Sequence, residues 1–250
     1  MKFSPPLICI LTVLRLTQAE NPLSQALRSI PIDINHYALD SRQIWACQQY
    51  VKLIAIAKCV TITDNFKCPA YCSEFPGTVL IDNFKLGKDD ITGYIARDDR
   101  RKAIVISLRG TLSASNLVVD MRMDLVPYPN PASMGARVHK GGLKASQIFS
   151  KSITPQICEL LRSNPDYEVE ILGHSLGGGL ALLLALNLIE SVEDLDKNKM
   201  VVVTVGEPRV GDKKFVEYFE SFKILSKRLV GSLDVVPYLP YNSLGYWVSH

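Results

Sequence analysis

The chain has 250 residues, of which 47% are hydrophobic and 21% are charged, and its formal net charge is +3. This length suits one α/β domain, and the composition excludes wholesale disorder because it supplies enough apolar side chains for a sizeable core. A net charge so close to zero gives no reason to expect nucleic acid or an acidic partner.

The N-terminal stretch MKFSPPLICILTVLRLTQAE has the layout of a secretory signal peptide. Lys2 precedes an apolar run, and the small residue Ala19 stands before the expected cleavage site. The run is too short to span a membrane, so no transmembrane segment is expected. An apolar N-terminal strand or helix is the alternative. We predict a secreted protein that loses residues 1–19 and keeps one domain over residues 20–250.

Helical and strand patterns follow one another along the rest of the chain. Apolar residues at helical spacing predict one or two helices over 36–61, and a loop with cysteine and proline follows over 66–76. Further helices are predicted at 142–163, 175–189 and 213–222, and strands at 78–82, 93–97, 103–108, 168–173, 200–206 and 227–236, the last running into a loop. Strands that alternate with helices from about residue 142 onward predict an α/β fold with a mostly parallel central sheet.

A cluster of glycines surrounds one serine where a predicted strand meets a predicted helix. The five residues 173–177 (GHSLG) fit the pattern G-x-S-x-G, whose expected context is this strand and helix. The glycines allow a sharp turn in which a Cβ would not fit. The turn places Ser175 at a helix N-terminus, where free N–H groups favour negative charge, and Leu176 supplies the first oxyanion N–H. We predict that Ser175 is a nucleophile; a structural turn with an incidental serine is the alternative.

A serine nucleophile needs a base and an acid that orients the base. In α/β enzymes with this turn the acid follows the serine in the chain. Asp234 follows a predicted strand and precedes the rigid segment VPYLP, so we predict Asp234 as the acid. Asp212 is the competitor, but it opens a predicted helix and is better explained as a helix cap.

The base is harder to assign among the four histidines. His174 is expected to point away from the serine, and His36 and His139 precede the serine in the chain, against the order expected of a triad. Only His250 follows the predicted acid, and a terminal residue is poorly held. Whether His250 can serve as the base stays open.

The chain has six cysteines, and Cys9 leaves with the predicted signal peptide. Five remain in an oxidising compartment, so at least one lacks a disulfide partner within the chain. Cys68 and Cys72 are close enough to form a local disulfide. A zinc site would need a second pair of ligands, which the sequence lacks. We therefore predict no metal and no cofactor.

Five segments together resemble the fungal-type class 3 lipases, a family of extracellular triacylglycerol lipases and feruloyl esterases. The segments are ISLRGT (106–111), VHKGG (138–142), GHSLGG (173–178), GEPRVGD (206–212) and DVVPYLP (234–240), and the similarity covers roughly residues 50–250. The resemblance implies an α/β-hydrolase fold. It matches Ser175 to the nucleophile, Asp234 to the triad acid and Thr111 to the second oxyanion residue.

The resemblance also matches residues 113–120 to a short lid that a lipid interface would open, with ordinary core packing as the alternative. Two features depart from the family pattern. GYWVSH (245–250) matches a segment whose histidine is structural, and the family's catalytic histidine lies further along the chain. Cys59 resembles a cysteine whose disulfide partner lies near the family's C-terminus. The resemblance therefore implies a chain that is shortened at its C-terminus and lacks the triad base.

The expected function is a secreted serine ester hydrolase, foremost a triacylglycerol lipase, that forms an acyl-enzyme on Ser175. We expect a monomer that acts on lipid at an oil–water interface. One alternative is a catalytically impaired, lipid-binding remnant that lacks the triad histidine. Another is an esterase for feruloyl or phospholipid esters, because the sequence does not reveal acyl-chain or head-group preference.

Overall fold

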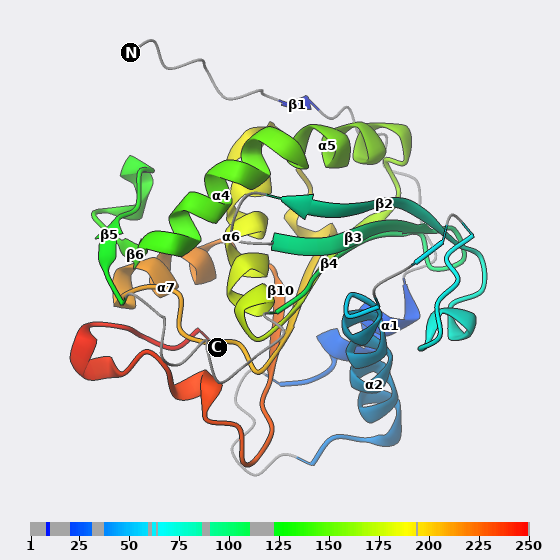
Figure 1. Ribbon diagram of the computed structural model, residues 1–250, viewed down its shortest axis with the longest axis horizontal. Helices are drawn as coiled ribbons and strands as arrows, with labels where there is room; N and C mark the ends of the chain where they lie inside the picture. The colour runs from blue at the N-terminus through cyan, green and yellow to red at the C-terminus, as the bar shows by residue number, and fades with distance from the viewer. Residues whose placement is uncertain are drawn as a thin grey trace.

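A six-stranded sheet with the strand order β10-β9-β7-β4-β3-β2 forms the centre of the molecule (Figure 1). The computed structural model describes residues 9–10, 21–31, 38–59, 62–63, 65–86, 91–110, 123–193 and 195–249. The strands are β2 (Thr78–Leu86), β3 (Ile91–Asp98), β4 (Ala103–Leu108), β7 (Glu168–His174), β9 (Met200–Val205) and β10 (Leu225–Leu229). Strands β4, β7, β9 and β10 pair in parallel, and β2 and β3 add an antiparallel edge. The predicted α/β class and mostly parallel sheet are confirmed.

Helices cover both faces of this sheet. They are α1 (Pro22–Arg28), α2 (Ser41–Ile56), α4 (Lys140–Ser152), α5 (Thr154–Ser163), α6 (Leu176–Ser191) and α7 (Lys213–Ser221). Figure 1 shows α1 and α2, in blue, on the side of the sheet away from α4 and α6. Among the described residues, no helix is long and apolar enough to cross a membrane.

Two apolar cores result, one on each face of the sheet. In β4, Ile104 and Ile106 pack into the core under α4 to α7, whereas Ala103 and Val105 pack into the core under α1 and α2. All six residues of β4 are buried. A parallel strand that is covered on both faces loses the alternation of polar and apolar residues, and the continuous apolar runs in the sequence reflect this burial.

Several helix boundaries differ from the sequence prediction for local reasons. The helix predicted over 142–163 is two helices, because Pro155 has no N–H to donate to the carbonyl four residues earlier and its ring would clash with that carbonyl. Helix α2 begins after Asp40, which forms a capping box with Gln43. Helix α1 was not predicted, although Asn21 caps it and Pro22 opens it, a recognisable start signal.

The last strand is shorter than predicted, and some small elements were missed. Strand β10 ends at Leu229 rather than near residue 236, because the chain turns where Asp234 N–H donates to the carbonyl of Gly231. The remaining strands and 3-10 helices are β1 (Cys9–Ile10) paired with β8 (Val192–Glu193), the hairpin β5 (Leu125–Pro127) and β6 (Arg137–His139), and η1 (Cys72–Glu74), η2 (Pro131–Ser133), η3 (Lys197–Lys199), η4 (Val236–Tyr238) and η5 (Asn242–Leu244).

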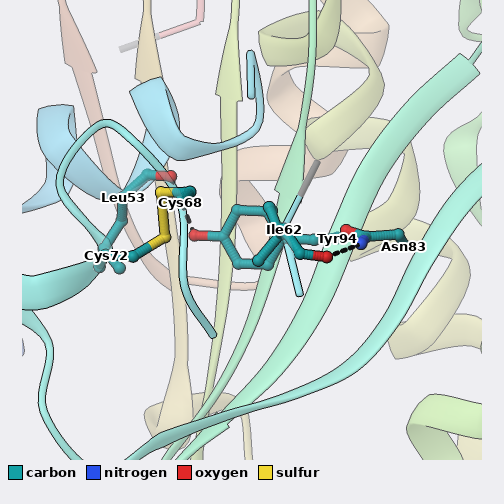
Figure 2. The surroundings of a disulfide bond; sticks show 6 residues. All are labelled: Leu53, Ile62, Cys68, Cys72, Asn83 and Tyr94. Atoms are coloured by element: carbon teal, nitrogen blue, oxygen red, sulfur yellow. Dashed lines mark hydrogen bonds between the residues drawn. A yellow bond between two sulfur atoms is a disulfide. The ribbon is translucent and has the colours of Figure 1, made fainter. Parts of the chain in front are cut away.

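The local disulfide between Cys68 and Cys72 is confirmed. Figure 2 shows it near the contact between α2 and the sheet, where Tyr94 Oη donates to the carbonyl of Leu53 over 2.9 Å. Cys72 is buried in the core under α1 and α2. Phe66 and Phe75 of the same loop are also buried there, so the disulfide and these two aromatic side chains together hold the cysteine-rich segment against that core. Cys59 is half-buried and forms no disulfide in the structure.

Candidate active site

Ser175 occupies the turn between strand β7 and helix α6 in a strained backbone conformation. Its φ and ψ are 55° and −127°, which a residue with a side chain rarely adopts. Two hydrogen bonds hold it there: its N–H donates to the carbonyl of Val205 over 2.9 Å, and its own carbonyl accepts from the N–H of Gly178 over 2.8 Å. Strain maintained by surrounding structure is a recurrent feature of functional sites.

Two glycines make this turn possible, as the sequence pattern predicts. A Cβ on Gly173 would lie 2.1 Å from the carbonyl oxygen of Gly177, and a Cβ on Gly177 would lie 2.3 Å from the carbonyl oxygen of Leu108. These neighbours are backbone atoms, which cannot move aside as a side chain can. The strand, the helix and the end of β4 therefore meet at a distance that only glycine permits.

Ser175 is 4% exposed. Its hydroxyl oxygen is buried and has no hydrogen-bond partner among the described residues. It lies at the start of α6, where the N–H groups of Leu176 and Gly177 have no acceptor within the helix. The helix dipole adds positive potential at the same place. This environment stabilises negative charge that develops beside the serine.

A second loop reaches the same turn. A Cβ on Gly110 would lie 3.0 Å from Ser175 Cβ and 2.5 Å from the carbonyl oxygen of His174. The segment that leads into Thr111 therefore packs directly against the serine turn. Thr111 itself and the expected lid at 113–120 lie outside the described residues.

In space, Asp234 lies at the carboxyl end of β9, close to Val205, whose carbonyl accepts the N–H of Ser175. Its Oδ2 faces Gly206, where an added Cβ would lie only 2.6 Å away. Gly206 has a φ of 59° and directly follows Val205, which accepts the Ser175 N–H. The structure thus brings the predicted nucleophile and the predicted acid to neighbouring positions at one edge of the sheet.

The competing acid, Asp212, has a structural role. Its Oδ1 accepts from the N–H of Phe215 over 2.9 Å at the N-terminus of α7. This confirms the cap predicted from the sequence. His139 also caps a helix, because its Nδ1 accepts from the N–H of Gly142 over 3.1 Å at the start of α4. His36 and His250 lie outside the described residues.

His174 is the described histidine nearest in sequence to the serine. Its ring is half-buried, and its Nδ1 has no hydrogen-bond partner among the described residues. Burial lowers the pKa of His174, and the charge of Lys58 lowers it further, whereas Asp234 acts in the opposite direction. The ring is therefore held in its neutral form near pH 7.

This lowered pKa predicts an acid-sensitive contribution to stability. The unfolded chain takes up a proton on His174 near pH 6.5, whereas the folded chain resists it, so the free energy of unfolding decreases as the pH falls below about 6.5. His174→Gln lacks this contribution and should show a shallower loss of stability between pH 7 and pH 5. Urea unfolding at several pH values measures both slopes. Equal slopes in the two proteins would contradict the assignment.

Sequence reasoning missed three residues that shape this site. Gly206 gives the positive φ beside Asp234 and could have been found as a glycine that ends an apolar strand. Arg209 and Arg228 bind backbone carbonyls of the segment that follows Asp234. Nothing in the local sequence identifies those acceptors. Within the described ranges, no three histidine, cysteine or acidic side chains gather as a metal site would require.

Comparison with known proteins assigns the chain to a protein family. A family model of class 3 lipases matches residues 105–244. The lipase of Rhizomucor miehei is 32% identical over 231 residues, covering 89% of this chain and 63% of that protein. A secreted mono- and diacylglycerol lipase from Gibberella zeae is 31% identical, covering 78% of this chain and 58% of that protein.

Solved structures agree with the sequence matches. One is a triacylglycerol lipase in which a serine protease triad forms the catalytic centre; it has a TM-score of 0.78 and 31% identity, covering 85% of this chain and 80% of that one. The fold is the expected α/β-hydrolase fold. The chain spans less than two thirds of the length of the two curated relatives described above. The matches to the family model and to these relatives show that the chain belongs to the class 3 lipase family.

Proposed function

We propose that this chain is a secreted serine ester hydrolase that acts on acylglycerols through an acyl-enzyme on Ser175. The observation that carries the proposal is the strained serine turn, with its unpartnered hydroxyl at a helix N-terminus and an acid at the adjacent strand end. A turn that served structure alone would not need a reactive side chain in a rarely populated conformation.

The proposed reaction has two steps. Ser175 Oγ forms a bond to the ester carbonyl carbon, its proton passes to a histidine base, and the alcohol leaves with that proton as the ester bond breaks. Water then releases the fatty acid from the acyl-enzyme. The N–H groups of Leu176 and Thr111 hold the oxyanion, and Asp234 orients the histidine. No metal or cofactor is needed for this chemistry.

An apolar rim around Asp234 supports a lipid ester as the substrate. Leu233 is 94% exposed and Val235 is 64% exposed, on either side of the acid. Tyr238 and Tyr241 follow, and both are also exposed. Exposed apolar side chains that follow one another along one loop offer a surface to which an apolar ligand can bind. Secretion after loss of residues 1–19, and action as a monomer at an oil–water interface, complete the proposal.

The test is hydrolysis of a short-chain nitrophenyl ester and of emulsified tributyrin by the full chain. We expect Ser175→Ala to lower kcat by about 10⁶-fold, because without the nucleophile only the weak residual catalysis of the oxyanion hole and substrate binding is left. His250→Ala, assayed beside it, shows whether His250 is the base: activity that survives assigns the proton transfer to another group.

A folded wild-type chain with no more activity than Ser175→Ala would overturn the proposal. Circular dichroism and thermal unfolding establish that both proteins are folded. That outcome would favour a lipid-binding protein, which binding to phospholipid vesicles and to an oil emulsion would then examine. Hydrolysis of feruloyl esters in preference to tributyrin would instead keep the mechanism and change the substrate.

A further inference from the structure

The loop that carries Asp234 has few apolar anchors of its own. Val230, Leu233 and Val235 are all exposed, so burial of apolar side chains does not fix the loop before residue 236. The hydrogen bonds of Asp234 are also local: its N–H donates to Gly231, and its Oδ1 accepts from the N–H of Val236 over 3.0 Å. These contacts shape the turn but do not attach it to the rest of the molecule.

Two arginines make that attachment, together with the buried side chains of Pro237, Leu239 and Pro240. Arg228 Nη2 donates to the carbonyl of Pro237 over 2.9 Å and to the carbonyl of Glu207 over 2.5 Å. It therefore connects the segment after Asp234 to the segment after β9. Glu207 belongs to the loop that begins at Gly206, which faces the carboxylate of Asp234.

Arg209 completes the attachment from the same loop. Its Nη1 donates to the carbonyls of Tyr238 and Pro240, each over 2.9 Å, and its backbone N–H donates to the carbonyl of Leu239 over 2.7 Å. All four carbonyls from residue 237 to residue 240 thus accept hydrogen bonds from Arg209 or Arg228. We call these two arginines the carbonyl clamp.

The chemistry of arginine suits this task. A guanidinium presents five N–H donors in a rigid plane and can bridge two carbonyls of different segments, whereas a lysine ammonium is a point charge on a flexible stem. Arg228 is half-buried, and burial lowers its pKa, while the carboxylate of Glu207 acts in the opposite direction. Arg228 also lowers the pKa of Arg209, after burial, so two like charges lie close together. Their hydrogen bonds to the carbonyls keep the two arginines in place despite this repulsion.

We propose that Arg228, with Arg209, is a positioning residue that sets Asp234 beside the serine turn. This inference rests on the proposed function, since positioning matters only if Asp234 orients a catalytic base. Arg228 acts by holding Pro237, and Arg209 by holding residues 238–240, against the loop after β9. A shift of about 1 Å in a catalytic group can lower a rate by about a hundredfold.

The first test needs no catalytic activity. Hydrogen–deuterium exchange is followed in peptides that cover residues 230–241 and residues 168–187. In Arg228→Met we expect faster exchange over 230–241 and unchanged exchange over 168–187. Arg137→Met is the matched control, because Arg137 Nη2 also donates to a carbonyl, that of Leu125, but away from the acid loop. Unchanged exchange over 230–241 in Arg228→Met would overturn the proposal.

The second test separates positioning from general stabilisation. We expect Arg228→Met to lower kcat for the nitrophenyl ester by about 10- to 100-fold with KM within about twofold. The double variant Arg228→Met/Asp234→Asn should have the same kcat as Asp234→Asn alone, because both changes remove the same effect, the orientation of the base by Asp234. Arg228→Lys should recover part of the loss. Independent, multiplicative losses in the double variant would overturn the proposal.

The tests distinguish failure of the proposed function from failure of the positioning role. A wild-type chain without Ser175-dependent activity refutes the function, while the exchange experiment still decides whether Arg228 holds the acid loop. If Arg228→Met does not fold, as thermal unfolding would reveal, Arg228→Lys and Arg209→Met replace it in both tests. Each removes part of the clamp.

Discussion

Replacing Gly173 by alanine is expected to lower the free energy of unfolding by about 3 kcal/mol or more and to abolish any Ser175-dependent ester hydrolysis. The new Cβ would lie 2.1 Å from the oxygen of Gly177, 2.4 Å from its carbonyl carbon and 2.6 Å from the nitrogen of Gly178. Only a movement of α6 away from β7 can relieve these overlaps, and that movement displaces the serine. Urea unfolding and the nitrophenyl ester assay measure the two effects.

Gly179→Ala, in helix α6 just after the serine turn, is the matched control. A Cβ there would lie 3.1 Å from a methyl group of Val210, which belongs to a side chain and can adjust. Alanine also favours a helix over glycine by about 1 kcal/mol. We therefore expect Gly179→Ala to stay within about 1 kcal/mol of the wild type. Equal stability of the two alanine variants would refute the steric argument for Gly173.

This turn was predictable from the sequence because its determinants are local. Gly173, Ser175 and Gly177 lie within five residues, and the strand before them and the helix after them follow from apolar patterns of ordinary length. The position of Asp234 after a strand was predictable for a related reason, because it is a matter of chain order; its role as the acid stays a prediction. The assignment of Asp212 as a helix cap also depends on its own few neighbours alone.

The support around Asp234 was not predictable, because its partners are backbone carbonyls far along the chain. Arg228 donates to the backbone carbonyls of residues 207 and 237. Every residue has such a carbonyl, so the sequence does not show which ones accept. The pairing depends on how β9 and β10 lie beside each other. The same holds for Gly206, whose positive φ matters because the carboxylate of Asp234 faces it.

A buried charge at the opposite end of β7 was missed for a similar reason. In the segment EVEILG, Glu170 resembles an outward-facing residue of an alternating strand, yet it is 0% exposed. Its carboxylate accepts from Arg101 Nη1 over 2.9 Å, from Tyr50 Oη over 2.9 Å and from Asn21 Nδ2 over 2.7 Å. The partners come from the N-cap of α1, from α2 and from the turn between β3 and β4. Burial is tolerated because each partner donates to the carboxylate.

Arg101→Met is therefore expected to lower the free energy of unfolding by about 3–5 kcal/mol, because it leaves Glu170 buried without its cation. Arg101 Nε also donates to Asp98 over 2.8 Å, so a second buried carboxylate loses its cation and keeps only neutral donors, the hydroxyl of Thr78 and two backbone N–H groups. Urea unfolding measures the loss. A second change, Glu170→Gln, should recover part of it, since a neutral amide costs less to bury than an unpaired carboxylate.

Arg97→Met isolates the effect of burial. Arg97 pairs with Asp99 through Nε over 2.6 Å, but the two side chains are 34% and 43% exposed. Solvent screens such a pair, so its removal should change the free energy of unfolding by no more than about 1 kcal/mol. Arg97 lies near the end of β3 and Arg101 in the turn that follows; both donate to carboxylates, but Arg101 is far more buried. Equal losses in the two variants would show that the desolvated charge of Glu170 does not determine stability at this edge of the sheet.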